Sequence, residues 1–291
     1  MLNKNVMTFI GCDCEYEEAK IVLFGAPFDS TTSYRPGTRF ASSTIRSESY
    51  GLETYSPYQD KDLEDYAYYF DSGDLELAMG SSELALNDIT TRTRLILNDH
   101  KLPFMIGGEH LVTLGAFKAV FEKYPDVHVI HFDAHTDLRE DYLGVPLSHA
   151  CVIKRCYDLV GDHKIHQFGI RSGMKEEFQF ASKHTDLHKF NFEGLKECVA
   201  SLKDKPVYFT IDLDVLDPAY FPGTGTPEFG GVSFLELLGA IHDVISQCHI
   251  VGMDVNELSP HLDPSGASTA AACKVIRECL LELSKGGNEN E

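Results

Sequence analysis

Three segments of the chain place histidine and aspartate residues directly after short apolar runs. Residues 106–110 read IGGEH, residues 129–137 read VIHFDAHTD, and residues 208–214 read YFTIDLD. Imidazole and carboxylate groups are common metal ligands. In open parallel sheets, ligands bind beyond the carboxyl ends of the strands. If the apolar runs are neighbouring parallel strands, the three segments form one polar cluster at the edge of a sheet.

The spacing within two of these segments brings ligand groups together. In an extended chain, residues two apart point to the same side. Asp133, His135 and Asp137 can therefore face one point, and so can Asp212 and Asp214. A single aspartate after a strand usually stabilises a turn or caps a helix. Burying several carboxylates close together is very costly without a cation, which favours metal binding here. The candidate ligands are His110, Asp133, His135, Asp137, Asp212 and Asp214.

The types of these ligands narrow the choice of metal. Four carboxylates and two imidazoles without a thiolate suit Mn²⁺. Six ligands are too many for one catalytic ion with open positions, so we expect two ions about 3.5–4 Å apart. Such ions lower the pKa of a bridging water and supply hydroxide near neutral pH. With four aspartates and one hydroxide the centre is about one unit negative, which suits a cationic substrate.

The apolar runs alternate with helical patterns, which predicts an α/β fold with a parallel sheet between layers of helices. We expect strands at residues 21–26, 104–106, 127–132, 165–170, 207–213 and 250–255. Helical periodicity covers residues 82–98, 110–123 and 233–247, and Ser233 with Glu236 has the spacing of a capping box. Because no linker interrupts the pattern, we expect one domain, 1–285, followed by a disordered polar tail, 286–291.

Composition excludes several classes of function. The 45 acidic residues outnumber the 25 basic ones and give a net charge of -20, so nucleic acid and anionic membranes are unsuitable partners. No apolar run is long enough to cross a membrane, and the N-terminus lacks a secretory signal. The chain is therefore expected to be cytoplasmic. Its eight cysteines, including the Cys12 and Cys14 pair, are expected to be free thiols.

The motifs resemble those of the ureohydrolase family, which includes arginases and agmatinases. GGEH, DAHTD and the DLDVLDP run at residues 212–218 match its metal-binding motifs. Further similar segments are GAPFD at 25–29, SYRPG at 33–37, FPGTGTP at 221–227 and MDVNELSP at 253–260. The resemblance spans roughly residues 20–280 in order.

This resemblance implies a three-layer α/β/α fold of the arginase/deacetylase type, with a central eight-stranded parallel sheet. It also implies two Mn²⁺ ions, trimers or hexamers, and hydrolysis of a guanidinium group to urea. His149 matches the catalytic histidine of the family, which with an ordinary pKa can protonate the departing amine. Glu257 matches the glutamate that binds the guanidinium, and Thr226 a threonine that supports it. Asp137 is a further catalytic candidate.

The loop at residues 138–149 bears on the substrate. It lacks the S-G-N element of arginases and looks like the loop of agmatinases, which cleave agmatine to urea and putrescine, a step of polyamine biosynthesis. Glu140 or Asp141 could meet the terminal ammonium of agmatine. Arg139 would instead favour a carboxylate tail such as that of 4-guanidinobutyrate. A guanidinobutyrase, another guanidino-acid ureohydrolase and an arginase are therefore the alternatives.

Two readings from other classes stay open. One is a two-metal hydrolase on the same fold that acts on a formimino or amide group. The other is a catalytically idle metal-binding relative, against which the complete ligand set, His149 and Glu257 argue. The sequence contains no P-loop, no Rossmann glycine fingerprint and no G-x-S-x-G elbow, so nucleotide-driven and serine-hydrolase chemistry are disfavoured.

Overall fold

A computed structural model of the protein describes residues 2–66 and 68–284, so the tail 286–291 lies outside the described residues. Eight strands form one sheet in the order β4-β1-β5-β10-β9-β6-β7-β8. Every neighbouring pair is parallel, as the family resemblance implied. The strands are β1 (Ile21–Gly25), β4 (Tyr69–Asp74), β5 (Leu102–Ile106), β6 (His128–Phe132), β7 (Ile165–Ile170), β8 (Asp186–Lys189), β9 (Pro206–Asp212) and β10 (His249–Asn256).

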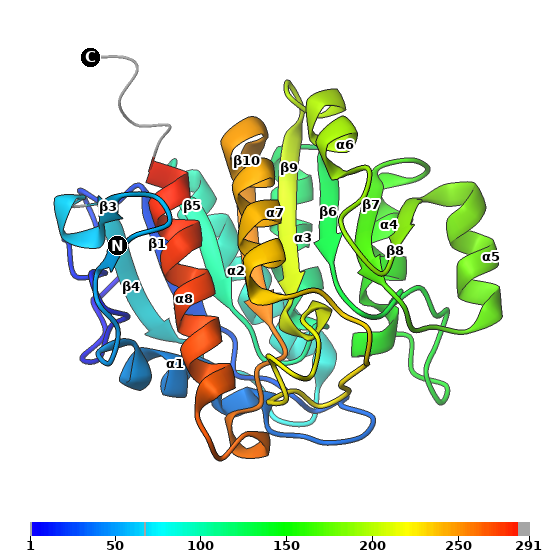
Figure 1. The fold of residues 1–291 in the computed structure, drawn as a ribbon, viewed down its shortest axis with the longest axis horizontal. Coiled ribbons are helices and arrows are strands. Elements are labelled where there is room, and N and C mark those ends of the chain that lie inside the picture. The colour runs from blue at the N-terminus through cyan, green and yellow to red at the C-terminus, as the bar shows by residue number, and fades with distance from the viewer. Residues whose placement is uncertain (1, 67, 285–291) are drawn as a thin grey trace.

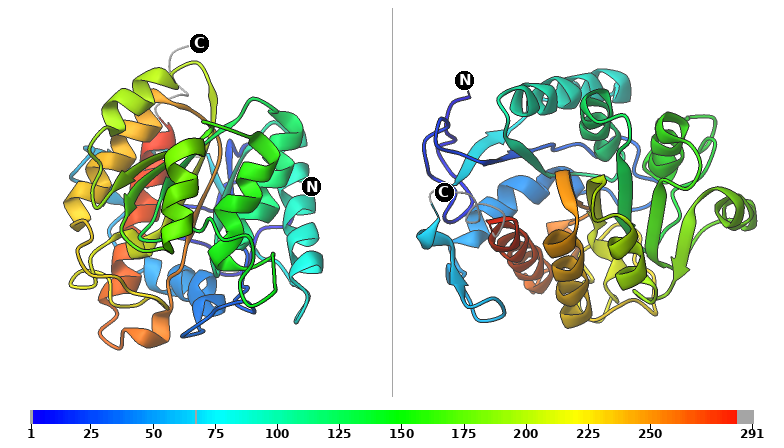
Figure 2. Two further views of the ribbon diagram at one scale, coloured as in Figure 1. Left: turned by 90° about the vertical axis from the view of Figure 1, so that its right-hand side faces the viewer. Right: turned by 90° about the horizontal axis from the view of Figure 1, so that it is seen from above.

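Helices cover both faces of this sheet, which confirms the three-layer expectation (Figures 1 and 2). Between the sheet and each helix layer lies a core of buried apolar side chains. One layer contains α1 (Ala41–Ser49), α6 (Leu195–Ser201), α7 (Phe234–Gln247) and α8 (Ala267–Leu283). The other contains α2 (Ser82–Asn98), α3 (Val112–Lys123) and α4 (Val152–Val160), while α5 (Lys175–His184) packs beside β8. A small antiparallel hairpin pairs β2 (Tyr55–Ser56) with β3 (Lys61–Asp62).

The apolar runs predicted the central strands to within two residues, but both edge strands were missed. β4 reads YFDSGD and β8 reads DLHK, so polar residues interrupt the apolar pattern that marks a buried parallel strand. The start of α7 was predicted correctly: the Ser233 hydroxyl accepts from the Glu236 N–H, and the Glu236 carboxylate accepts from the Ser233 N–H. Helix α3 begins at Val112, two residues later than expected.

The carboxyl ends of β5, β9 and β6 carry the candidate ligands. Strands β6 and β9 are neighbours, whereas β10 lies between β9 and β5. Figure 1 shows the long loops gathered at this edge of the sheet. The three ligand strands are therefore not all adjacent, and the strand between them brings Glu257 to the same edge.

Gly107 and Gly108 allow the close packing of this region. A Cβ at position 107 would lie 1.7 Å from the Asn256 side-chain oxygen, and one at position 108 would lie 2.0 Å from the Phe28 carbonyl oxygen. Neither glycine has a positive φ. The two glycines are therefore required by the lack of space, and not by a sharp turn of the backbone.

No helix among the described residues has the length and hydropathy needed to cross a membrane. All eight cysteines are free thiols, and Cys12 is buried while Cys14 is partly exposed. The expectation of unpaired cysteines is therefore confirmed.

Candidate metal centre and substrate pocket

The His110 ring nitrogen Nδ1 marks the middle of the candidate centre. It lies 2.9 Å from an Asp133 oxygen, 3.2 Å from an Asp137 oxygen and 3.4 Å from an Asp212 oxygen. All four side chains are buried. Residues from β5, β6 and β9 thus converge as the sequence predicted.

His135 and Asp214 complete the set on the side nearer to solvent. His135 Nδ1 lies 3.1 Å from an Asp214 oxygen and 3.4 Å from an Asp133 oxygen. Asp133 is therefore shared between the His110 side and the His135 side, as a carboxylate bridging two ions would be. Backbone N–H groups hold the other aspartates: Ala134 donates to Asp214, and Asp214 itself donates to Asp212.

Thr210 and Asp254 fix the orientation of the His110 ring. The Thr210 hydroxyl donates its proton to Asp254 at 2.6 Å and lies 2.9 Å from His110 Nε2. Since its proton is already used, the hydroxyl accepts from His110 Nε2–H. The lone pair of Nδ1 then faces the three carboxylates, which is the tautomer that a metal ligand needs. Sequence reasoning missed Asp254, although it lies in the MDVNELSP motif.

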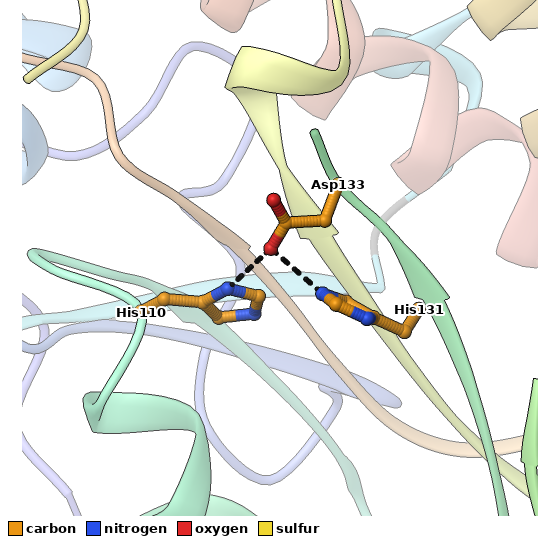
Figure 3. A group of neighbouring side chains, drawn as sticks. All are labelled: His110, His131 and Asp133. Carbon is orange, nitrogen blue, oxygen red and sulfur yellow. Dashed lines mark hydrogen bonds and ion pairs between the residues drawn. The ribbon is translucent and has the colours of Figure 1, made fainter. Parts of the chain in front are cut away.

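His131 orients Asp133 in a similar way, and it too was missed. The Gln167 amide donates to His131 Nδ1 at 3.1 Å, so Nε2 carries the proton and donates to the Asp133 carboxylate at 2.7 Å. Figure 3 shows that His110 and His131 approach the same Asp133 oxygen. Because its Nε2 is a donor, His131 is a positioning residue and not a seventh ligand. Its place two residues before Asp133 was the available signal.

The unsatisfied atoms of this cluster fit a bound cation. His110 Nδ1 and one Asp214 oxygen are buried without a hydrogen-bond partner. A lone pair that faces three carboxylates is repelled unless a positive charge lies between them. In the chain alone, burial and the charge of Asp133 raise the pKa of the Asp137 carboxyl to about 7. The six residues therefore fit a metal centre.

Glu257 lies beside the centre, at the end of β10. One oxygen accepts from the His110 backbone N–H at 2.7 Å, and the side chain lines the pocket. Its backbone is in the left-handed region, with φ of 67°, a strained conformation that is typical of functional sites. Burial and the neighbouring Glu109 raise the pKa of the Glu257 carboxyl well above its usual range.

His149 begins the short helix η3 (His149–Cys151) and lines the same pocket. Its Nε2 lies 3.1 Å from the Ser33 hydroxyl, and its backbone N–H donates to Thr31. Burial lowers the pKa of His149 to about 4. The expectation of an ordinary pKa is therefore wrong for the substrate-free pocket, in which His149 is neutral at pH 7.

The pocket has a volume of about 270 Å³, near the lower end of small-ligand sites. Thr226 lines it together with Arg139 and Tyr142. The Arg139 guanidinium stacks on the Tyr142 ring at 4.8 Å and pairs with Glu177 at 3.5 Å. The positive charge of Arg139 is thus partly neutralised.

Neither acidic residue proposed for the substrate tail lines the pocket. Glu140 pairs with Lys154 and Arg155 at 3.0 Å each, and the Asp141 carboxylate accepts from the Gly144 N–H. Both side chains are held by these local contacts. The partly exposed carboxylate of Glu228 does line the pocket, on the solvent-exposed side that we call the pocket mouth. Sequence reasoning missed it.

Two further buried carboxylates hold the loops of the site. Glu109 accepts from the Thr31 backbone and hydroxyl and from the Thr32 hydroxyl, which fixes the loop that meets His149. Glu177 accepts from the Thr136 hydroxyl and from the Leu138 N–H, which fixes the chain around Asp137. Glu109 lies inside the GGEH motif, but nothing in the sequence pattern distinguishes Glu177 from a surface residue of a helix.

Comparisons with known proteins agree with this geometry. The chain is 48% identical over 281 residues to the agmatinase of Bacillus subtilis, and this covers 95% of the chain and 96% of the relative. It is 37% identical to an N(1)-aminopropylagmatine ureohydrolase of Thermococcus kodakarensis, over 94% of each protein. A crystal structure assigned as an agmatinase from Clostridium difficile superposes with a TM-score of 0.91 and 56% identity, covering 94% of the chain and 99% of that structure. The family model described as the arginase family matches residues 19–282, and the chain therefore belongs to the arginase family.

Proposed function

We propose that the protein is a binuclear manganese hydrolase that cleaves the guanidinium group of agmatine to urea and putrescine. The observation that carries this proposal is the Glu257 carboxylate beside the metal ligands, in the same pocket. A carboxylate there can hold a guanidinium group against the centre. The 48% identity to an agmatinase supports agmatine among guanidino compounds.

Two Mn²⁺ ions would be held by His110, Asp133, His135, Asp137, Asp212 and Asp214. The donor set contains no thiolate and is rich in carboxylates, which suits manganese. When bound, the ions make hydroxide available near neutral pH. The rest of the reaction depends on residues of the chain that hold the substrate and move protons.

Glu257 and Thr226 would position the guanidinium. The His110 N–H already holds one Glu257 oxygen, so the carboxylate is fixed before substrate arrives and its other oxygen is free to accept from substrate N–H groups. Such preorganisation places the guanidinium carbon for attack. Thr226 lines the same pocket and supplies a hydroxyl beside it.

Asp137 and His149 would carry the proton that the departing amine needs. An amine leaves readily only after protonation. His149 is neutral at rest, because burial lowers its pKa to about 4. It is therefore suited to take up a proton during the reaction and to pass it on, and not to store one beforehand.

Glu228 would meet the terminal ammonium of agmatine. Its carboxylate accepts from the Ser172 hydroxyl at 2.9 Å and has no cationic partner closer than His135, at 3.9 Å, among the residues with described contacts. Arg139 is engaged by Glu177 and Tyr142. The net charge at the pocket mouth therefore favours a cationic tail over a carboxylate tail.

The test is urea release by the Mn²⁺-loaded chain from agmatine, N(1)-aminopropylagmatine, arginine and 4-guanidinobutyrate. We expect the highest kcat/KM for agmatine. Glu228→Gln should raise the KM for agmatine, while Glu140→Gln, which lies outside the pocket, should leave it unchanged. Faster turnover of arginine or guanidinobutyrate would overturn the choice of substrate, and no urea from any of them would overturn the reaction.

A further inference from the structure

We propose that the chain carries a second, mononuclear metal site of zinc type, formed by His166, Asp186 and Cys198. It lies near the amino ends of β7 and β8, whereas the catalytic pocket lies at the carboxyl ends of the strands. The ligand atoms of these three side chains all lie within 4.8 Å of one another. His166 comes from the start of β7, Asp186 from the start of β8 and Cys198 from α6. Figure 1 shows α6 at the end of the sheet away from the long loops.

Strand pairing explains why the three groups meet. His166 and Asp186 are direct partners in the parallel pair β7–β8, so their side chains lie next to each other on one face. Helix α6 covers that face. It can approach closely because Gly194 precedes its first residue, and a Cβ there would lie 2.4 Å from the ring of His188. This approach places Cys198 over the pair.

The donor set suits a borderline divalent ion. One imidazole nitrogen, one carboxylate oxygen and one thiolate sulfur are the ligand types of Zn²⁺. Binding releases the thiol proton to solvent as the ion–sulfur bond forms. A divalent ion with one thiolate, one carboxylate and one neutral imidazole has no net charge, which suits a site with two buried ligands. A water would complete four-coordination.

Neighbouring histidines already hold two of the three ligands, His166 and Asp186, in position. His166 Nδ1 faces Asp186 at 3.2 Å, while its Nε2 lies 3.1 Å from His128 Nδ1. His188 Nε2 lies 3.1 Å from the other Asp186 oxygen, and its ring stacks on Phe168. A ligating histidine typically donates its second N–H to such a partner, and a ligating carboxylate is typically hydrogen-bonded. This support is what a metal site requires beyond its ligands.

Cobalt binding by the Mn²⁺-loaded full chain tests the proposal. Co²⁺ bound to a thiolate gives a near-ultraviolet charge-transfer band, and none of the six ligands proposed for the catalytic centre is a cysteine. We expect this band in the wild-type chain, with one ion more per chain than in Cys198→Ser. Zn²⁺ should abolish the band by displacing cobalt. The measurement does not depend on catalytic activity.

Two further variants keep the test decisive. Asp186 is partly exposed, so Asp186→Asn should fold. The variant retains the Cys198 thiol but should bind cobalt at least roughly tenfold more weakly. Cys248→Ser changes a cysteine near Cys198 and should leave the band intact. Absence of the band in the wild-type chain would overturn the proposal, as would its survival in Cys198→Ser or an unchanged affinity in Asp186→Asn.

Discussion

At the scale of single residues, a substitution at Glu257 tests substrate binding without removing a proposed metal ligand. In Glu257→Gln the amide oxygen can still accept from the His110 N–H, so the amide nitrogen faces the donors of the guanidinium. Losing this charge-assisted contact should cost at least ~3 kcal/mol, which lowers kcat/KM more than a hundredfold. Steady-state kinetics with metal analysis checks this. Loss of manganese from the variant would show that Glu257 is a ligand, contrary to the proposal.

His149 should affect the proton step and not the metals. Its Nε2 contacts Ser33 and no ligand of the centre. His149→Asn should therefore retain both ions while kcat falls on the order of 10²-fold. If kcat and its pH profile stay unchanged with full metal content, another group carries the proton.

Asp137 makes metal binding depend on pH. Its carboxyl pKa is raised to about 7 in the chain alone, so below this pH a proton must leave before Mn²⁺ binds. Burial also raises the pKa of the Asp212 carboxyl, so more than one proton must leave and the apparent affinity should rise at least tenfold per pH unit up to about pH 7. Because the folded pKa lies above the unfolded one, the metal-free chain should also lose stability as pH rises from about 4 to 7. Calorimetric titration at several pH values measures the affinity, and a flat profile would contradict the assignment.

Two of the residues that sequence reasoning missed, His131 and Asp254, act through other residues. The six ligands stand out because histidine or aspartate residues follow an apolar run at three strand ends. The roles of His131 and Asp254 become clear only when Gln167 and Thr210 are placed beside them. Glu228 could not be identified from the sequence, because the pocket mouth is formed by loops that are distant in sequence.

At the scale of elements, apolar continuity identified the central strands and failed at both edges. An edge strand is paired on one side only, so β4 and β8 can carry polar residues that erase the pattern. The order of the strands could not be obtained from periodicity. The place of β10 between β5 and β9 depends on packing between distant segments.

The loop after β5 should be sensitive to the smallest added side chain. In Gly108→Ala the new Cβ would collide with the backbone of Phe28, so the loop must shift, at a cost of about 1–3 kcal/mol, and manganese affinity should fall because His110 moves. Gly239→Ala is the matched control in α7, where a Cβ meets nothing within 4 Å. It should gain about 0.5–1 kcal/mol. Equal unfolding free energies for the two variants would show that the space argument is wrong.

At the scale of the whole molecule, the net charge and the sheet topology both favour the binding of cations. The net charge of -20 favours cations over anions near the surface. The parallel sheet brings buried carboxylates to one edge, where bound metal ions would compensate their charge. Assembly into trimers or hexamers stays a prediction that light scattering can test.

The central claim is that six residues from three strand ends hold two manganese ions. Anomalous diffraction at the manganese edge, from crystals saturated with Mn²⁺, tests it most directly. We predict two peaks about 3.5–4 Å apart, contacted by His110, Asp133, His135, Asp137, Asp212 and Asp214, with His131 bound to neither. A single peak at full saturation, or a peak ligated by His131, would contradict this account.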